Sequence, residues 1–203
     1  KLLIYFNLPY EKGESEKFGF HVFDNSLISI WNKQIVLPYK EELFDVEDYI
    51  VDHNGNVHIL GLIYKEKRKT KRKGAPNYKY LVLSYYSNAD DHKEHTVQLE
   101  GKFLTDMQIA INDNEEIICA GFYSNEGTFS IIGSYFIKIN SITRNITTKS
   151  FKPFAIDLIT QNMTERQEKK TKKQEQKGKD PELNEYDLDD IILKEDGGAI
   201  LIG

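Results

Sequence analysis

Short apolar runs alternate with polar turns along the whole chain. A run of about five residues has the length of a strand rather than of a helix. Three pairs of such runs share one order: acidic residue, apolar run, turn of Asn, Asp and Gly type, apolar run, glycine. The pattern predicts three β-hairpins of one kind. They span residues 48–61, 106–121 and 189–203.

The turns of these hairpins carry residues that favour a positive φ. Asn54-Gly55 and Asp196-Gly197 predict a type I′ turn, in which both central residues have positive φ. The middle hairpin has no glycine, and residues 112–114 (Asn-Asp-Asn) are expected to take that role, because Asn and Asp tolerate the left-handed region.

The closing glycines set a spacing. Gly121 follows Gly61 by 60 residues, and Gly203 follows Gly121 by 82, a gap that includes a charged segment of roughly 20 residues. Two further apolar runs lie between successive hairpins, so each unit of about 60 residues contains four strands. These additional strands are expected at residues 18–23, 28–37, 78–86, 95–99, 130–139 and 146–151.

Antiparallel four-stranded units at a fixed spacing are the plan of β-propeller blades. The chain resembles β-propeller repeat proteins in this pattern alone, since the Trp-Asp dipeptide, the Asp-box and the kelch double glycine are absent. The resemblance implies an all-β fold and an incomplete ring of about three blades. It carries no family function. A β-sandwich or an open barrel is the alternative.

The spacing also predicts how the chain is divided. Residues 1–203 form a single repeat domain, expected to be part of a longer propeller. We expect a partial blade at 1–43, blades at 44–102 and 103–161, a charged insertion at 162–185, and the start of the next blade at 186–203.

Composition narrows the classes of partner. The net charge of −5 disfavours nucleic acid as a partner, because phosphate contacts need a basic face. No apolar stretch approaches the roughly 18 residues of a membrane span. Cys119 is the only cysteine and lies in an apolar run, which predicts a buried, inert thiol and no intrachain disulfide. The location is open, with a preference for the periplasm or cell surface.

Two charged segments interrupt the pattern. Residues 65–73 are rich in Lys and Arg, and residues 163–180 contain strong helix formers with Thr164 placed to cap a helix. The first is expected to be a solvated loop or an anion-binding patch. The second is expected to be an exposed helix or a disordered loop, because it has too few apolar residues for a core of its own.

Acidic residues recur near the start of the first strand of each unit. Asp48, Asp106 and Asp189 are predicted to surround the mouth of a central channel, where they would bind a cation or a basic ligand. The alternative is that each caps a turn or bonds to backbone. The acidic residues concerned are Asp45, Glu47, Asp48, Asp106, Asp187, Asp189 and Asp190.

No catalytic residue, metal ligand or cofactor is predicted. The five histidines have no metal-ligand grouping, and there is no glycine-rich phosphate loop and no Gly-x-Ser-x-Gly elbow. The preferred hypothesis is a non-enzymatic binding or scaffolding propeller with a protein or carbohydrate ligand. The alternative is a propeller hydrolase or lyase acting on carbohydrate, with carboxylates about 5–10 Å apart. The oligomeric state is not predicted.

Overall fold

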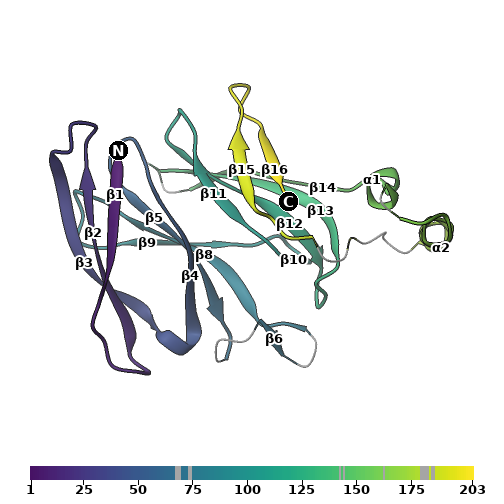
Figure 1. Ribbon diagram of the computed structural model, residues 1–203, viewed down its shortest axis with the longest axis horizontal. Coiled ribbons are helices and arrows are strands. Elements are labelled where there is room, and N and C mark those ends of the chain that lie inside the picture. Colours follow the sequence, from purple (N-terminus) through teal and green to yellow (C-terminus); the bar gives the residue numbers. More distant parts are fainter. Residues whose placement is uncertain are drawn as a thin grey trace.

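The computed structural model describes residues 1–66, 70–72, 75–141, 143, 145–161, 163–178, 183 and 186–203. It contains four antiparallel sheets, formed one after another along the chain, and two helices that lie at one end, beyond β14 (Figure 1). A two-stranded hairpin of β6 (Lys71–Arg72) and β7 (Ala75–Pro76) leaves the second sheet.

The sheets are numbered here in chain order, and each strand pairs antiparallel with its neighbours in the order given. The first sheet is β1 (Leu2–Leu8), β2 (Ser15–Phe23) and β3 (Ser29–Lys40). A 3-10 turn, η1 (Glu41–Leu43), leads to the second sheet. That sheet is β4 (Phe44–Val51), β5 (Val57–Tyr64), β8 (Tyr78–Tyr85) and β9 (Lys93–Val97).

The third sheet has a divided first strand. Both β10 and β11 pair with the same strand, β12, and residues 105–107 between them leave the ladder. The third sheet is β10 (Lys102–Leu104), β11 (Gln108–Ile111), β12 (Glu116–Asn125), β13 (Ile131–Asn140) and β14 (Ile146–Pro153). The fourth is β15 (Asp190–Leu193) and β16 (Ala199–Ile202).

The fold is mostly β, as the sequence predicts, and none of the described sheets closes into a barrel. The predicted strands are found with shifts of a few residues at their ends. The sequence analysis did not predict the break between β10 and β11, the β6–β7 hairpin or helix α1 (Ile156–Thr160). The arrangement of the sheets as propeller blades stays a prediction.

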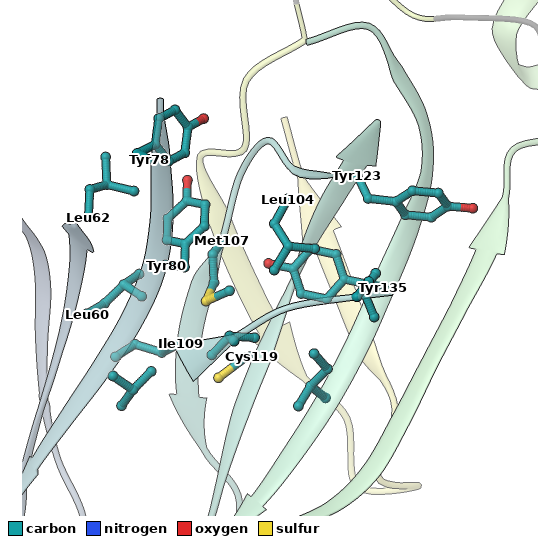
Figure 2. Close-up of a cluster of buried hydrophobic side chains, with 14 of the residues drawn as sticks. Leu60, Leu62, Tyr78, Tyr80, Leu104, Met107, Ile109, Cys119, Tyr123 and Tyr135 are labelled. Atoms are coloured by element: carbon teal, nitrogen blue, oxygen red, sulfur yellow. The ribbon is translucent and has the colours of Figure 1, made fainter. Parts of the chain in front are cut away.

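The second sheet is covered on both faces. One face packs on the first sheet, where Phe20 and Leu83 belong to one buried cluster. The other face packs on the third sheet, where Leu60 and Tyr80 meet Ile109 and Cys119 (Figure 2). Burying both faces of the sheet explains why β5 and β8 are apolar almost throughout rather than alternating.

The first strands of the last three sheets lie next to one another. Strand β11 contacts β4 on one side and β15 on the other, and β1 also contacts β4. The sheets extend from this row of strands (Figure 1).

The three predicted hairpins share one turn geometry. In the first, the Asp52 amide donates to the Asn56 carbonyl and the Gly55 amide donates to the Asp52 carbonyl, each at 3.0 Å. In the second hairpin the amide of residue 112 donates to the carbonyl of residue 116, and the amide of 115 donates to the carbonyl of 112. In the third hairpin the amide of residue 194 donates to the carbonyl of residue 198, and the amide of 197 donates to the carbonyl of 194. The prediction of type I′ turns is wrong, because each turn has only one residue at positive φ. These residues are Gly55 (87°), Glu115 (61°) and Gly197 (81°).

Glu115 therefore occupies a position where the other two turns have glycine. Its left-handed backbone costs about 1–2 kcal/mol for a residue with a Cβ, whereas glycine there loses about 0.5–1 kcal/mol of chain entropy. We expect Glu115→Gly to raise the free energy of unfolding by about 0.5–1 kcal/mol in urea titrations. The reverse change, Gly55→Ala, is the control and should destabilise. A destabilised Glu115→Gly would show that the contact of Glu115 with His53 (3.1 Å) outweighs backbone strain.

The closing glycines are required by close backbone packing. A Cβ on Gly121 would lie 2.1 Å from the carbonyl oxygen of Asp106, and one on Gly203 would lie 2.2 Å from that of Asp187. A Cβ on Gly61 would lie 2.9 Å from the Asp45 carbonyl oxygen and closer still to the Phe44 ring. At Gly121 and Gly203 the chain just before the first strand crosses the glycine, and at Gly61 the start of β4 does so, which leaves a side chain no room.

The charged insertion forms a helix, one of the two predicted outcomes. Helix α2 (Glu165–Glu175) begins at Thr164, whose hydroxyl accepts from the Gln167 amide while the Gln167 side chain accepts from the Thr164 amide. This capping box confirms Thr164 as the cap. None of the helix residues is buried. The predicted insertion runs from residue 162 to residue 185, and residues 162, 179–182, 184 and 185 lie outside the described part.

Candidate functional site

Asp48 and Asp190 occupy matching places in two sheets. Asp48 pairs with Leu60 and Asp190 with Ile202, one residue before the closing glycine in each case. Each carboxylate accepts a hydrogen bond of 2.7 Å from the amide of the next residue. Burial raises the pKa of Asp48, and the charge of Asp190 adds to the rise against the opposing effect of the backbone bond. These two carboxylates therefore lie within electrostatic reach of each other.

Asp106 lies in the break between β10 and β11, not on a strand. Burial, together with the charge of Asp187 and against the opposing effect of the Thr105 hydroxyl, raises the pKa of its carboxyl to about 6. Asp106 and Asp187 are thus a second pair of neighbouring carboxylates. Asp187 is exposed.

Asp189 does not share the position of Asp48 or Asp106. It is exposed and comes just before β15, where its amide donates to the Ile202 carbonyl at 2.8 Å. The predicted trio Asp48, Asp106 and Asp189 therefore comes from three different register positions. The structure pairs Asp48 with Asp190 and Asp106 with Asp187 instead. A ligand-binding role for the trio stays a prediction.

The raised pKa of Asp106 has a consequence for stability. A carboxyl with a folded pKa above its unfolded value destabilises the fold as pH rises between the two, here from about 4 to about 6. We expect Asp106→Asn to raise the free energy of unfolding at pH 7 by about 1–2 kcal/mol, allowing for solvent screening. Near pH 4 the variant and the wild type should have the same free energy of unfolding.

Urea titrations at pH 4 and pH 7 check this expectation. Asp113→Asn is the matched control, because Asp113 is exposed at a turn tip, and it should change stability by less than about 0.5 kcal/mol at either pH. A loss of stability in Asp106→Asn at pH 7 would mean that the ionised carboxylate has a favourable partner in the fold.

Three tyrosine hydroxyls hold the segment that presents Asp106. Tyr78 and Tyr80 donate to the Thr105 carbonyl, at 2.9 and 3.2 Å, and Tyr135 donates to the Asp106 carbonyl at 2.8 Å. The segment has left the strand ladder, and these bonds satisfy carbonyls that no neighbouring strand reaches. Burial raises the pKa of each phenol, so all three remain donors at neutral pH. The sequence analysis treated these tyrosines only as strand formers.

A buried Asp-His-Ser set joins the β4–β5 turn to strands β5 and β8 and was not predicted. His58 on β5 contacts the Ser84 hydroxyl through Nδ1 at 2.8 Å and the Asp52 carboxylate through Nε2 at 3.4 Å. A carboxylate only accepts, so Nε2 carries a proton and donates to Asp52. Asn56 also donates to Asp52. No sequence spacing marks the set, because Ser84 lies 26 residues from His58.

This set has the composition of a serine-hydrolase triad but not its accessibility. Asp52 is 1 % exposed, and His58 and Ser84 are 0 % exposed. A nucleophile must be reached by its substrate, so the set is a structural link between the hairpin of the second sheet and β8. Burial alone would raise the pKa of Asp52, but the bonds from His58 and Asn56 bring it below its ordinary value.

A cleft of about 710 Å³ opens between the second and third sheets. Its walls come from the start of β8, from the connection between β9 and β10, and from the turn between β12 and β13. The lysines and two of the aromatic residues that line the cleft are Lys65, Tyr78, Lys79, Lys102, Phe103 and Lys149.

In the part of the chain that the structure describes, no group of three His, Cys, Asp or Glu residues could hold a metal ion. Cys119 is buried as predicted, and burial raises the pKa of its thiol to about 12. No described helix combines the length and the hydropathy needed to cross a membrane. The chain matches no protein-family model, no curated protein and no solved structure. Function is therefore argued from its own residues.

Proposed function

We propose that this chain is part of a β-propeller that binds a ligand without chemical turnover. The observation that carries the proposal is the row of first strands, β4, β11 and β15, each in contact with the next. In a propeller the first strand of every blade lines a common axis, and successive blades pack face to face. The doubly covered second sheet supports the same arrangement, since a sandwich of two sheets leaves one face of each open.

The ligand is expected on the face where the chain enters each first strand. The cleft lies there, and so do Asp106 and the insertion that carries α1 and α2. Connections between strands carry binding residues more often than the strands themselves do. The buried state of Asp52, His58 and Ser84 removes the one triad-like set described above from the catalytic candidates.

An experimental structure tests the architecture. We expect that the rotation that places β4 and β5 on β11 and β12 also places β11 and β12 on β15 and β16. For a ring of four to eight blades the rotation is about 45–90° about one axis. Two unrelated rotations, or a translation between the sheets, would rule out a propeller.

A carbohydrate hydrolase or lyase is the second candidate function. It is favoured by the Asp106–Asp187 pair, in which the partly buried carboxyl has its pKa raised to about 6, a suitable value for a general acid. The test is release of reducing ends or unsaturated products from a panel of neutral and acidic polysaccharides. We expect no turnover by the wild type. Turnover that is lost in Asp106→Asn/Asp187→Asn, with the fold retained, would establish the enzyme instead.

A further inference from the structure

The outer face of the first sheet, at the left end of the molecule in Figure 1, is apolar and exposed. Leu3 of β1 packs on the cluster shared with the second sheet, so its alternating neighbours Leu2, Ile4 and Phe6 point the opposite way. These three side chains are 43, 49 and 38 % exposed. The strand pairing places Val36 of β3 on the same face, with 61 % of its side chain exposed. Leu2, Ile4, Phe6 and Val36 define the head face.

The fourth sheet also has an apolar face that is exposed. Leu201 of β16 packs on a buried cluster that includes Phe122 of the third sheet. Its neighbours Ile200 and Ile202 therefore point away from the third sheet. Ile192 of β15 pairs with Ile200 and shares its face, because residues directly opposite each other in a ladder lie on one side of the sheet. The three isoleucines, 48, 49 and 40 % exposed in chain order, define the tail face.

Successive sheets inside the molecule pack through two kinds of face. One kind carries the glycine of the second strand: Gly61 lies on the face of the second sheet that packs on the first, beneath the buried Phe44 ring. The other kind carries the residues on either side of that glycine, since Leu60 and Leu62 belong to the cluster shared with the third sheet. On the third sheet the face toward the second is again the glycine face, because Cys119 lies in that same cluster and Gly121 is two residues further along β12. A contact between successive sheets thus joins the flanking-residue face of one sheet to the glycine face of the next.

The head face is a glycine face, and the tail face is a flanking-residue face. Gly19 pairs with Phe6, whose ring fills the place of a Cβ on Gly19 just as the Phe44 ring does on Gly61. Phe44 is 1 % exposed beneath the first sheet, whereas Phe6 is 38 % exposed. On the tail face, Ile202 is the residue directly before the closing glycine. The chain therefore exposes both halves of an interface that it forms between its own sheets.

We propose that the tail face of one molecule packs on the head face of a second copy of this chain. A second copy covers each free face with the kind of surface that covers the equivalent face inside the molecule. The contact is heterologous, because two different surfaces meet. It removes the exposed apolar side chains of both faces from water, and this burial drives the association.

The contact goes beyond the proposed function and does not need a propeller. Closure into a ring does rest on the propeller: with a rotation of about 45° between sheets, two copies of four sheets form a closed ring. A heterologous contact with a rotation that does not close gives an open series of copies instead. The size of the assembly therefore separates the two ideas.

Three replacements of isoleucine by glutamate, at sites of nearly equal exposure, test the contact. Ile4→Glu changes the head face and Ile200→Glu the tail face, and both side chains are 49 % exposed. The matched control is Ile146→Glu on β14, which is 44 % exposed and belongs to neither face. The measurement is sedimentation velocity at about 1–100 μM chain, a range that detects micromolar dissociation constants. The samples are wild type, each variant, and an equimolar mixture of Ile4→Glu with Ile200→Glu.

We expect wild type and Ile146→Glu to form the same assembly, a pair of chains if the ring closes. Each face variant should associate at least about 30-fold more weakly, because a charge replaces an apolar side chain within the contact. The mixture should form a one-to-one pair, since the tail face of Ile4→Glu and the head face of Ile200→Glu are both intact. Urea unfolding checks that each variant is folded, and Leu2→Glu or Ile192→Glu replaces a face variant that is not.

Several outcomes would overturn the proposal. A wild type that is monomeric at every concentration has no such contact. Loss of association in only one face variant would mean that the chains pair head to head or tail to tail, and a mixture that stays monomeric, or an equal loss in Ile146→Glu, would also exclude the contact. Species that grow with concentration and lose association in both face variants would support the contact and exclude the closed ring. If the sheets obey one rotation but the wild type is monomeric, the contact between copies fails and the propeller stands.

Discussion

Replacing His58 by alanine is expected to lower the free energy of unfolding by about 3–5 kcal/mol, a large share of the stability of a typical domain. His58 is 0 % exposed and lies between the Ser84 hydroxyl and the Asp52 carboxylate. The substitution leaves a cavity, removes the partner of Ser84 and takes one donor from a buried carboxylate. Urea unfolding at pH 7 measures the loss.

The same measurement with His53→Ala is the control. His53 is in the same hairpin, but its side chain is 61 % exposed, so removing its contact with Glu115 should cost less than about 1 kcal/mol. A loss for His58→Ala no larger than for His53→Ala would mean that the buried set contributes little to stability.

The difference in free energy of unfolding between His58→Ala and wild type should also depend on pH. The folded pKa of Asp52 is lowered, so the stabilisation of its carboxylate is complete above the unfolded pKa, about 3.9, and is lost as pH falls through the folded value. We therefore expect the difference in free energy of unfolding between the two proteins to be largest near neutral pH. This difference in free energy of unfolding should narrow as pH falls below about 3.9, and it should be smallest below the lowered folded pKa of Asp52, where the carboxyl is neutral in both proteins.

Gly121→Ala is the second substitution with a large expected effect, a loss of about 2–4 kcal/mol. The added Cβ would lie 2.1 Å from the Asp106 carbonyl oxygen and 2.8 Å from its carbonyl carbon. That carbonyl also accepts the Tyr135 hydroxyl, so the segment cannot move away without breaking a buried hydrogen bond. Thermal and urea unfolding should both report the loss.

Gly198→Ala is the control for the close approach. A Cβ there would meet only the side chain of Asp196, at 3.0 Å, and that side chain can rotate away. The change should cost less than about 1 kcal/mol. Similar losses in the two variants would mean that the general preference for glycine, and not the crossing backbone at Gly121, accounts for the effect.

The sequence is sufficient to predict most strands because their apolar runs are short and bounded by turn residues. The break between β10 and β11, which the sequence did not predict, has a physical reason. The packing of Gly121 against Asp106 and the bonds from three tyrosine hydroxyls hold residues 105–107 between β10 and β11, and these contacts involve residues distant in sequence. The middle turn was misassigned because Glu115 has a low preference for positive φ, and the ladder on both sides imposes it.

The candidate site was less predictable than the fold. Acidic residues near each first strand were identified, but the pairing of Asp48 with Asp190 and of Asp106 with Asp187 depends on contacts between sheets. The buried His58–Ser84 contact and the cleft likewise bring together residues that are distant in sequence. The basic run at 65–73 was visible, but only the fold places the ends of its loop beside three further lysines.

Every strand in the four sheets pairs with strands close to it in the chain, joined mostly by short turns. Such pairings have low contact order, and their loop-closure entropy is small, which favours rapid formation of each sheet by itself. The larger contacts between sheets then join successive neighbours in chain order. A polypeptide with this topology can acquire its structure progressively from the N-terminus during translation, since no early strand has to wait for a distant one.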